Sequence, residues 1–343
     1  HELLHEREGY GGFFRLAGYS PPGSSDPARN IRSFFQSILC TSADLGTIIS
    51  NYPEALAHAL VLIRTAETTS VLPPWVVHTY PATREIMDRL RFTPCGQPEC
   101  VHCSKTLDPH TALRELFGYD SFRTFDHESG MGIQERSVRH ALAGGSLLTV
   151  FPTGGGKSLT FQLPALMQGE TTRALTVVIS PLVSLMKDQV DVLEERHHIV
   201  KAVHLSGLLS PLEREQVIER VEDGRAHLVY VAPESLRSPT LFKLLVGRSI
   251  ARFVIDEAHC FSEWGQDFRV DYLYIAEFIK KLQAEKGEPT PIPVSCFTAT
   301  AKPQVRADIQ KYFRERLGVE LESFVSEARR ENLMYEVVEV ESP

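Results

Sequence analysis

The hydrophobic and polar positions of this 343-residue chain change their pattern near residue 147. From there on, short apolar runs rich in β-branched residues alternate with longer segments whose apolar residues recur every three or four positions. The short runs predict strands at 147–151, 175–180, 201–206, 227–233, 251–256 and 294–298. The longer segments predict a helix from Leu159 onward and further helices at 182–196, 211–223, 240–246, 272–285 and 302–317. This alternation indicates the α/β class, with a mostly parallel sheet covered by helices on both faces.

Residues 1–112 have a different character. The stretch 9–30 is rich in Gly, Pro and Ser and is typical of a loop, and prolines interrupt 70–81. Apolar residues at helical spacing predict helices at 31–40, 54–67 and 84–91. We therefore expect three parts, which are a mainly helical accessory module over 1–112, the α/β domain over 113–325, and over 326–343 the lead-in to a further lobe that this chain does not contain.

The composition is that of an ordinary globular protein, with 43% hydrophobic and 23% charged residues and a net charge of −8. The acidic balance argues mildly against a broad phosphate-binding surface but leaves room for a narrow basic groove. No apolar run reaches the roughly 18 residues of a membrane-spanning helix. The charged start of the chain also lacks the apolar core of a secretory signal. We expect a cytoplasmic protein without a membrane partner.

A glycine-rich segment joins the predicted strand at 147–151 to the helix that follows it. Its sequence is Pro-Thr-Gly-Gly-Gly-Lys-Ser. Glycines let backbone N–H groups turn toward an anion, and a helix N-terminus favours negative charge. The candidate nucleotide-binding residues are Thr153, Gly154, Gly155, Gly156, Lys157 and Ser158. Lys157 would reach the β- and γ-phosphates and Ser158 would ligate Mg²⁺. A glycine-rich turn with a surface lysine is the alternative, which the order of strand, glycines, Lys-Ser and helix disfavours.

Two adjacent carboxylates follow the strand predicted at 251–256. They belong to the sequence Asp-Glu-Ala-His, residues 256–259. A carboxylate at a strand end near the phosphate loop can hold Mg²⁺, and a second one can take a proton from an attacking water. Asp256 is therefore the candidate metal-side carboxylate and Glu257 the candidate general base. An acidic turn at a strand end is the alternative.

Three cysteines, Cys95, Cys100 and Cys103, have the spacing C-x₄-C-x₂-C. Thiolates at this spacing can converge on one tetrahedral Zn²⁺, so we expect a structural zinc knuckle within the N-terminal module. A fourth ligand is needed, and the candidates are Cys40, which we prefer, His102 and His110. An iron–sulfur cluster or three reduced thiols are the alternatives.

The motifs together resemble the RecQ family of superfamily 2 DNA helicases, over roughly residues 113–335. The segments that carry the resemblance are 116–123, 152–158, 180–189, 231–234, 256–259, 262–272 and 297–301. The resemblance implies a RecA-like P-loop domain that uses ATP and Mg²⁺ and moves 3′ to 5′. It implies single-stranded or partly duplex DNA and a second RecA-like lobe as partners, and a nucleoid location in a prokaryote. The family's zinc follows the motor lobes, so the cysteines here are a different site.

The resemblance also implies roles for single residues. Tyr119 and Arg123 would sandwich adenine and Gln134 would read its edge, although the sequence TFDHESGMGI separates Arg123 from Gln134 more widely than in the family. Core packing is the alternative for Tyr119 and Phe122.

The aromatic-rich segment after the Asp-Glu-Ala-His sequence supplies the implied DNA contacts. Trp264 and Phe268 would offer stacking faces and Arg269 a cation to single-stranded DNA, and His259 would relay between them and the γ-phosphate. Ordinary core aromatics are the alternative. Thr298 and Thr300 would hydrogen-bond toward the carboxylates or cap a helix.

The second lobe of the family supplies arginines for the transition state, and no equivalent follows Pro343. We therefore expect this chain by itself to bind nucleotide weakly and to hydrolyse it very slowly. Two other functions fit the same motifs. One is an RNA-dependent superfamily 2 ATPase, and the other is a nucleotide-gated scaffold that docks protein partners through 1–112.

Overall fold

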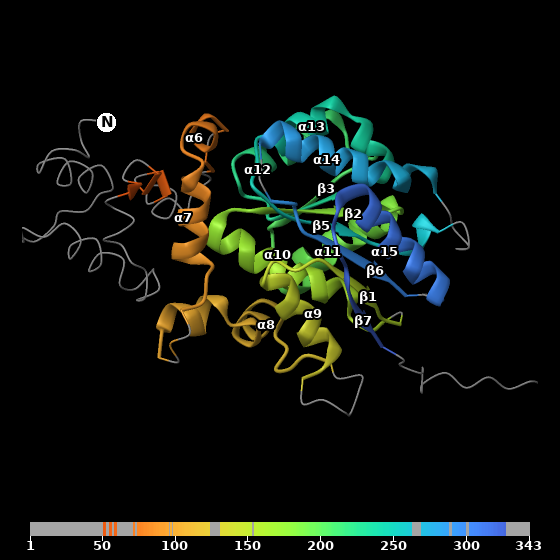
Figure 1. Cartoon of the computed structure of the whole chain (residues 1–343), viewed down its shortest axis with the longest axis horizontal. Helices are drawn as coiled ribbons and strands as arrows, with labels where there is room; N and C mark the ends of the chain where they lie inside the picture. Colours follow the sequence, from red (N-terminus) through yellow and green to blue (C-terminus); the bar gives the residue numbers. More distant parts are fainter. Residues whose placement is uncertain are drawn as a thin grey trace, which may run out of the picture.

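The computed structural model describes residues 51–52, 55–56, 58–59, 71–72, 74–95, 97, 99–123, 131–152, 154–262, 269–287, 290–299 and 302–326 (Figure 1). Several predictions lie outside these residues. They concern the helix at 31–40, most of the helix at 54–67, the lead-in beyond 326, and the residues Cys40, Thr153, Trp264, Phe268 and Thr300.

Seven parallel strands form one sheet in the order β3-β4-β2-β5-β6-β1-β7. Their bounds are β1 Leu147–Val150, β2 Leu175–Ile179, β3 Ala202–Leu205, β4 Leu228–Val231, β5 Ile250–Ile255, β6 Val294–Thr298 and β7 Glu322–Val325. The six predicted strands and the parallel sheet are confirmed, with ends that differ by one or two residues. Strand β7 was missed because half of it faces solvent, which leaves no apolar run to find.

The strand order brings four strand ends together. Strand β1 pairs with β6 on one side and β7 on the other, and β5 lies between β6 and β2. Because all strands are parallel, the carboxyl ends of β1, β6, β5 and β2 meet at one edge of the sheet. The glycine-rich segment follows β1 and the Asp-Glu-Ala-His sequence follows β5, so the topology places the two motifs at this edge.

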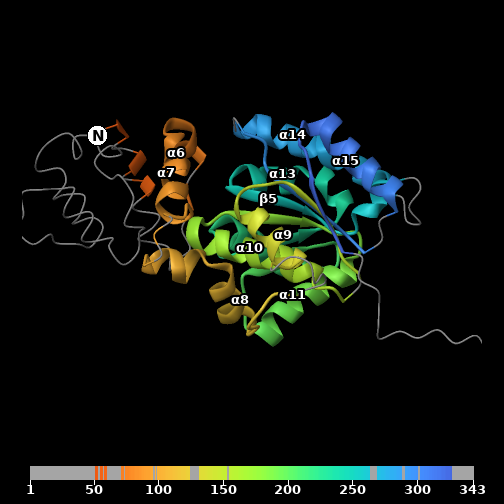
Figure 2. The ribbon, with the colours of Figure 1, turned by 60° about the horizontal axis from the view of Figure 1, so that its bottom comes forward.

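Helices cover both faces of the sheet, as predicted (Figures 1 and 2). One face packs against α8 Pro109–Phe117, α9 Ile133–Leu142, α10 Lys157–Thr172 and α11 Val183–His197. The other packs against α12 Pro211–Glu222, α13 Pro239–Val246, α14 Ile275–Lys286 and α15 Pro303–Leu317. Successive strand residues serve opposite cores, because Val178 points to the first set while Val177 and Ile179 point to the second. Among the described residues, no helix has the length and apolar character to cross a membrane.

Two helices of the N-terminal region lie against the α/β domain. They are α6 Pro74–Thr79 and α7 Ala82–Arg91, beside α10 (Figures 1 and 2). Helix α7 confirms the prediction at 84–91, and it buries Ile86, Met87 and Leu90. Prolines interrupt 70–81 as predicted, since α6 begins at Pro74 and Pro81 lies between α6 and α7. The short helix between these prolines was not predicted; proline fits the first turn of a helix because no N–H is needed there.

Helix α8 crosses residue 112, where the sequence places a domain boundary. Asp108 caps its start by accepting a hydrogen bond from the Thr111 N–H at 2.8 Å. Gly118 ends it in the left-handed conformation, at φ 71°. The division at 112 stays a prediction.

Candidate nucleotide site

The glycine-rich segment forms a tight loop that ends in a helix. Gly154 and Gly156 have φ values of +80° and +81°, a region that other residues rarely adopt. At Gly155 a Cβ atom would lie 2.8 Å from the Pro152 carbonyl oxygen, so this position also requires glycine. Helix α10 begins at Lys157, two residues before the predicted start at Leu159. The loop therefore presents backbone N–H groups and a helix N-terminus at the edge of the sheet, which suits a phosphate group.

The Asp-Glu-Ala-His sequence is held by hydrogen bonds to strand β2 and to the helical turn at Tyr272. The Asp256 N–H donates to the Ile179 carbonyl at 2.9 Å, and the Tyr272 hydroxyl donates to the Asp256 carbonyl at 2.9 Å. Glu257 has a φ of +46°, which is rare for a residue with a side chain. Such backbone strain persists where the surrounding structure holds it, often at functional sites. Here it turns the Glu257 carboxylate toward the glycine-rich loop.

The predicted catalytic side chains are brought into contact. The Lys157 Nζ atom lies 3.0 Å from Glu257 Oε1, although the two residues are 100 positions apart. The His259 Nδ1 atom lies 3.2 Å from Glu257 Oε2 and 3.1 Å from Thr298 Oγ1. Thr298 thus contacts the histidine of this sequence, whereas the sequence predicted a contact with its carboxylates.

Burial and charge move the pKa values of the two carboxyls in opposite directions. Burial, followed by the neighbouring Glu257 charge, raises the pKa of Asp256 above its usual value. Burial acts in the same sense on Glu257, but the hydrogen bond to His259 and the charge of Lys157 outweigh it and lower that pKa. Adjacent carboxyls with separated pKa values suit different roles. A cation bound at Asp256 would offset the cost of burying its charge, so this carboxylate suits a magnesium ion. Ser158, the other predicted ligand, is the second residue of α10.

The proposed adenine residues connect to the same loop. The Gln134 side chain, which is 1% exposed, accepts from the Arg123 N–H at 2.8 Å and donates to the Gly156 carbonyl at 3.1 Å. The Arg123 guanidinium donates to the Gly154 carbonyl. Tyr119 is exposed and its ring meets the edge of the His197 ring, with centroids 6.1 Å apart. Phe122 packs in the hydrophobic core, whereas Tyr119 does not. The alternative that these aromatic residues only pack in the core is therefore confirmed for Phe122 and not for Tyr119.

The end of β2 supplies contacts that sequence reasoning missed. The Ser180 Oγ atom lies 3.5 Å from Asp256 Oδ2, and its place as the last residue of the strand predicted at 175–180 was the available signal. The Arg269 guanidinium donates to the Pro181 carbonyl at 3.0 Å. The segment that begins at Arg269 is therefore held against the end of β2, beside the candidate magnesium carboxylate.

The cysteine knuckle is brought together as predicted. The sulfur atoms of Cys95, Cys100 and Cys103 all lie within 4.8 Å of one another. No histidine joins this cluster among the described residues. The His102 Nε2 atom lies 3.1 Å from the Arg91 carbonyl oxygen and the His110 Nε2 atom 2.8 Å from Glu135 Oε1. The preferred fourth ligand, Cys40, lies outside the described part of the chain.

Comparison with known proteins identifies the family. The family model described as DEAD/DEAH box helicase matches residues 131–309, which is just over half of the chain. The chain therefore belongs to the DEAD/DEAH box helicase family. Within that family its sequence is RecQ-like, since 35–40% identity to proteins named as RecQ-type helicases extends over about two thirds of the chain.

Two relatives illustrate this similarity. The ATP-dependent DNA helicase RecQ of Bacillus subtilis (strain 168) is 37% identical over 231 residues, which are 67% of this chain and 35% of that protein. The ATP-dependent helicase SGS1 of Saccharomyces cerevisiae is 38% identical over 230 residues, which are 66% of this chain and 14% of that protein. The chain thus spans about a third or less of these relatives. Among solved structures, the DNA-bound DUF1998 helicase MrfA has a TM-score of 0.48 and 21% identity, over 63% of this chain and 29% of that one.

The paired carboxyls predict how Asp256 titrates in a variant. In Glu257→Gln, the pKa of Asp256 falls, because the neighbouring negative charge that raises it is gone. It stays above the usual aspartate value, because burial is the larger cause and does not change. Carboxyl-carbon NMR titration of the nucleotide-free protein measures this. Glu277→Gln, on the exposed face of α14, is the matched control and leaves the Asp256 titration unchanged; an unchanged pKa in Glu257→Gln contradicts the coupling.

Proposed function

We propose that this chain is the ATP-binding half of an ATP-dependent DNA helicase or translocase. The observation that carries the proposal is the contact of Lys157, Glu257 and His259 at the end of the glycine-rich loop. A phosphate-binding loop beside a carboxylate poised as a base is the arrangement that nucleoside triphosphate hydrolysis requires. The relatives are named ATP-dependent DNA helicases, which supports DNA as the partner.

The residues divide the reaction between them. The loop at Gly154 and Gly156 would hold the phosphates, with Lys157 on the β- and γ-phosphates. Magnesium, held through Ser158 and Asp256, would neutralise phosphate charge. Glu257 would accept the proton of the attacking water, which its lowered pKa allows because the carboxylate is ionised at neutral pH.

The contact between Lys157 and Glu257 has a consequence for the cycle. The two side chains form an ion pair at 3.0 Å. Phosphates that take Lys157 would release Glu257 for a water molecule. His259 would then keep the Glu257 carboxylate oriented, because its ring lies within hydrogen-bond distance of that carboxylate. Thr298 would in turn hold the His259 ring, since its hydroxyl lies within hydrogen-bond distance of the same ring nitrogen.

The adenine end would be completed by Tyr119, Arg123 and Gln134. The Gln134 amide joins the backbone at Arg123 to that at Gly156. An adenine that takes the Gln134 amide would therefore alter a bond to the phosphate loop. This supports a role for Gln134 in coupling base recognition to the position of the loop.

Coupling to DNA would pass through the segment after the Asp-Glu-Ala-His sequence. Trp264 and Phe268 would stack on bases and Arg269 would contact the strand. Two described contacts support this route, because Arg269 binds the Pro181 carbonyl and Tyr272 binds the Asp256 carbonyl. We also propose 3′-to-5′ movement, a second RecA-like lobe in the full protein, protein partners at residues 1–112, and a location where the DNA is, the nucleoid in a prokaryote.

We propose that Cys95, Cys100 and Cys103 hold a structural zinc ion, with Cys40 as the preferred fourth ligand. Sulfur atoms within 4.8 Å of one another fit a single tetrahedral ion. Neither His102 nor His110 belongs to this cluster in the described part of the chain, which leaves Cys40 as the preferred candidate.

Removal of the general base separates binding from hydrolysis. In Glu257→Gln, the ATPase rate falls about 10²–10⁴-fold, because proton transfer contributes on that order. ATP binding persists, because Lys157 and the loop are intact and Lys157 loses its competing partner. Initial-rate ATPase assays and equilibrium binding of a labelled ATP analogue, on the full-length protein, measure the two quantities. Glu277→Gln is the matched control with wild-type values; a hydrolysis rate that survives Glu257→Gln removes Glu257 from the reaction.

Single-stranded DNA should stimulate the ATPase of the full-length protein, and Trp264→Ala should abolish the stimulation while leaving the basal rate. The reason is that stacking on an aromatic face contributes about 1–3 kcal/mol per base. Rates with and without single-stranded DNA and RNA of the same sequence test this. Stimulation by RNA in place of DNA would instead identify an RNA-dependent ATPase.

The knuckle predicts the metal content of the protein. The purified wild type carries a single zinc ion per chain, and Cys100→Ser loses it, because one thiolate of the set is gone. Elemental analysis measures this. Cys296→Ala, a buried thiol outside the knuckle, is the control and keeps the ion. Iron with visible charge-transfer absorption would favour a cluster, and a metal-free wild type would refute the site.

A further inference from the structure

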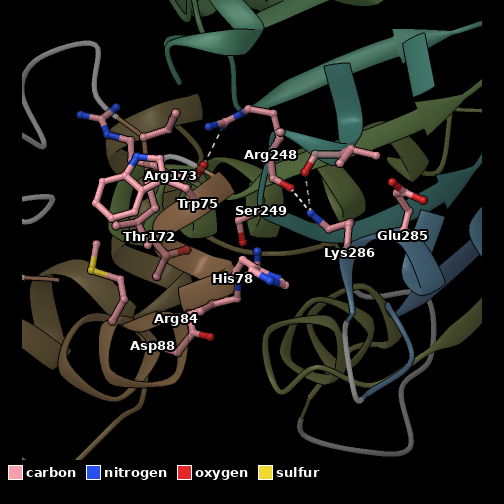
Figure 3. A pocket seen from close by; sticks show the side chains of 15 residues that line it. Trp75, His78, Arg84, Asp88, Thr172, Arg173, Arg248, Ser249, Glu285 and Lys286 are labelled. Carbon is pink, nitrogen blue, oxygen red and sulfur yellow. Dashed lines mark hydrogen bonds between the residues drawn. The ribbon is translucent and has the colours of Figure 1, made fainter. Parts of the chain in front are cut away.

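A cavity of about 340 Å³ lies between the N-terminal helices and the α/β domain (Figure 3). Helices α6 and α7 form one wall. The opposite wall contains Arg173, which precedes β2, and Arg248 and Ser249, which precede β5. Because these residues stand at the amino ends of parallel strands, the cavity is at the edge of the sheet opposite the candidate nucleotide site. Its size is in the range that holds a small ligand.

Arg173 and Arg248 bring two buried positive charges to this cavity. Arg173 is 5% exposed and Arg248 is 2% exposed. The Nε atoms of both are buried without a hydrogen-bond partner. Within the described residues, neither guanidinium forms an ion pair, and that of Arg173 makes no hydrogen bond. A buried polar group without a partner costs free energy, and a charged one costs more, so both groups have unused capacity for an anion.

Helix capping explains only part of this arrangement. Helices α10, α13 and α14 end at the cavity, and cations favour helix carboxyl ends. The Arg248 guanidinium donates to the Arg173 carbonyl at 2.7 Å, and the Lys286 ammonium donates to the Val246 carbonyl at 3.3 Å and the Arg248 carbonyl at 2.5 Å (Figure 3). Arg173 has no such role, since its guanidinium binds no carbonyl. Its charge also disfavours that of Arg248, whose pKa burial lowers to about 10.

The carboxylates near these arginines form no ion pair with them among the described residues. Burial lowers the pKa values of Arg173 and Arg248, and the charges of Glu170 and Asp223 offset this only in part. The Glu170 carboxylate lies 3.7 Å from Lys201 Nζ and 3.7 Å from His227 Nδ1. Asp88 and Glu285 line the cavity, but neither pairs with Arg173 or Arg248. Arg84 and Lys286 line it as well. The cavity wall therefore holds more cationic than acidic side chains, in a chain whose net charge is −8.

The cavity also has an aromatic wall. Trp75 on α6 is 60% exposed and lines the cavity near Arg173 (Figure 3). An exposed indole offers a stacking face, and guanidinium groups match the geometry of phosphate oxygens. We propose that this cavity binds the phosphate monoester of a nucleotide-sized ligand, with the base against Trp75 and the phosphate on Arg173 and Arg248. The source is a free mononucleotide or the phosphorylated end of a nucleic-acid strand.

Thymidine monophosphate is the probe, and Lys157→Ala is the background that weakens binding at the glycine-rich loop. Calorimetry on the full-length Lys157→Ala protein is expected to show one binding event at this cavity. Adding Arg84→Gln weakens it about tenfold, since it removes one of the cationic side chains that line the cavity and attract the phosphate. Arg89→Gln, an exposed residue of the same helix, removes the same charge away from the cavity and leaves binding unchanged.

Two further variants separate the parts of the ligand. Trp75→Ala weakens thymidine monophosphate about tenfold, in line with the loss of a base stack, and leaves binding of inorganic phosphate unchanged. Arg173→Gln abolishes both. Since Arg173→Gln alters a buried position, its thermal melting is recorded first, and Arg84→Gln carries the test if that variant does not fold.

The source of the phosphate follows from short oligothymidylates that carry either a 5′-phosphate or a 5′-hydroxyl. Tighter binding of the phosphorylated strand, lost in Arg84→Gln, assigns a strand end, and binding of thymidine monophosphate alone assigns a free nucleotide. The proposal is overturned if no probe binds the Lys157→Ala protein, or if binding is equal in Arg84→Gln and Arg89→Gln. It is also overturned if Arg173→Gln raises the melting temperature and binds the probe as tightly as its parent. These outcomes do not depend on ATP hydrolysis, so they leave the proposed function untouched.

Discussion

The burial of a parallel sheet on both faces is the constraint on which the rest of this structure depends. After each parallel strand, the chain must return to the starting edge of the sheet before the next strand begins, so each connection runs back over one face of the sheet as a helix. The apolar strands satisfy this because alternate residues, such as Val177 and Val178, enter opposite cores. As a result, polar residues that follow the strands collect at one edge. A site built from segments a hundred residues apart is a consequence of that packing.

At this edge, the charges of neighbouring residues set the pKa values of the two carboxyls, Asp256 and Glu257. The Lys157 ammonium satisfies Glu257, while Asp256 is left buried beside a like charge, which its raised pKa records. The charge of Glu257 is therefore compensated by Lys157, whereas burial disfavours the charged form of Asp256. An ion at Asp256 together with phosphates at Lys157 would resolve both conditions at once. In the function we propose, this would link ATP binding to the release of the Glu257 carboxylate from Lys157. The backbone of Glu257 has a φ of +46°, a strained value that the surrounding structure holds.

At the opposite edge of the sheet the buried charged groups are positive, whereas Asp256 at the first edge is negative. Here the amino ends of strands and the carboxyl ends of helices meet α6 and α7, and Arg173 and Arg248 are buried with unused hydrogen-bonding capacity. Such groups are costly unless an anion joins them. The N-terminal helices thereby contribute to a cavity that neither they nor the α/β domain could form separately.

The sequence by itself determined the strands β1 to β6, the helices between them, the glycine-rich loop and the roles that Lys157, Asp256 and Glu257 can take. These follow from local periodicity and from the chemistry of a few residue types, which act over short distances along the chain. Strand β7 and helix α6 were not predicted, because a half-exposed strand and a short helix that begins with proline give weak local patterns of apolar residues. Only the tertiary structure decided the strand order, and with it the contacts of Thr298 with His259, of Ser180 with Asp256 and of Gln134 with Gly156. It also decided the burial of Arg173 and Arg248 beside Trp75. These are properties of packing between distant segments, and no local pattern of hydrophobic and polar residues encodes them.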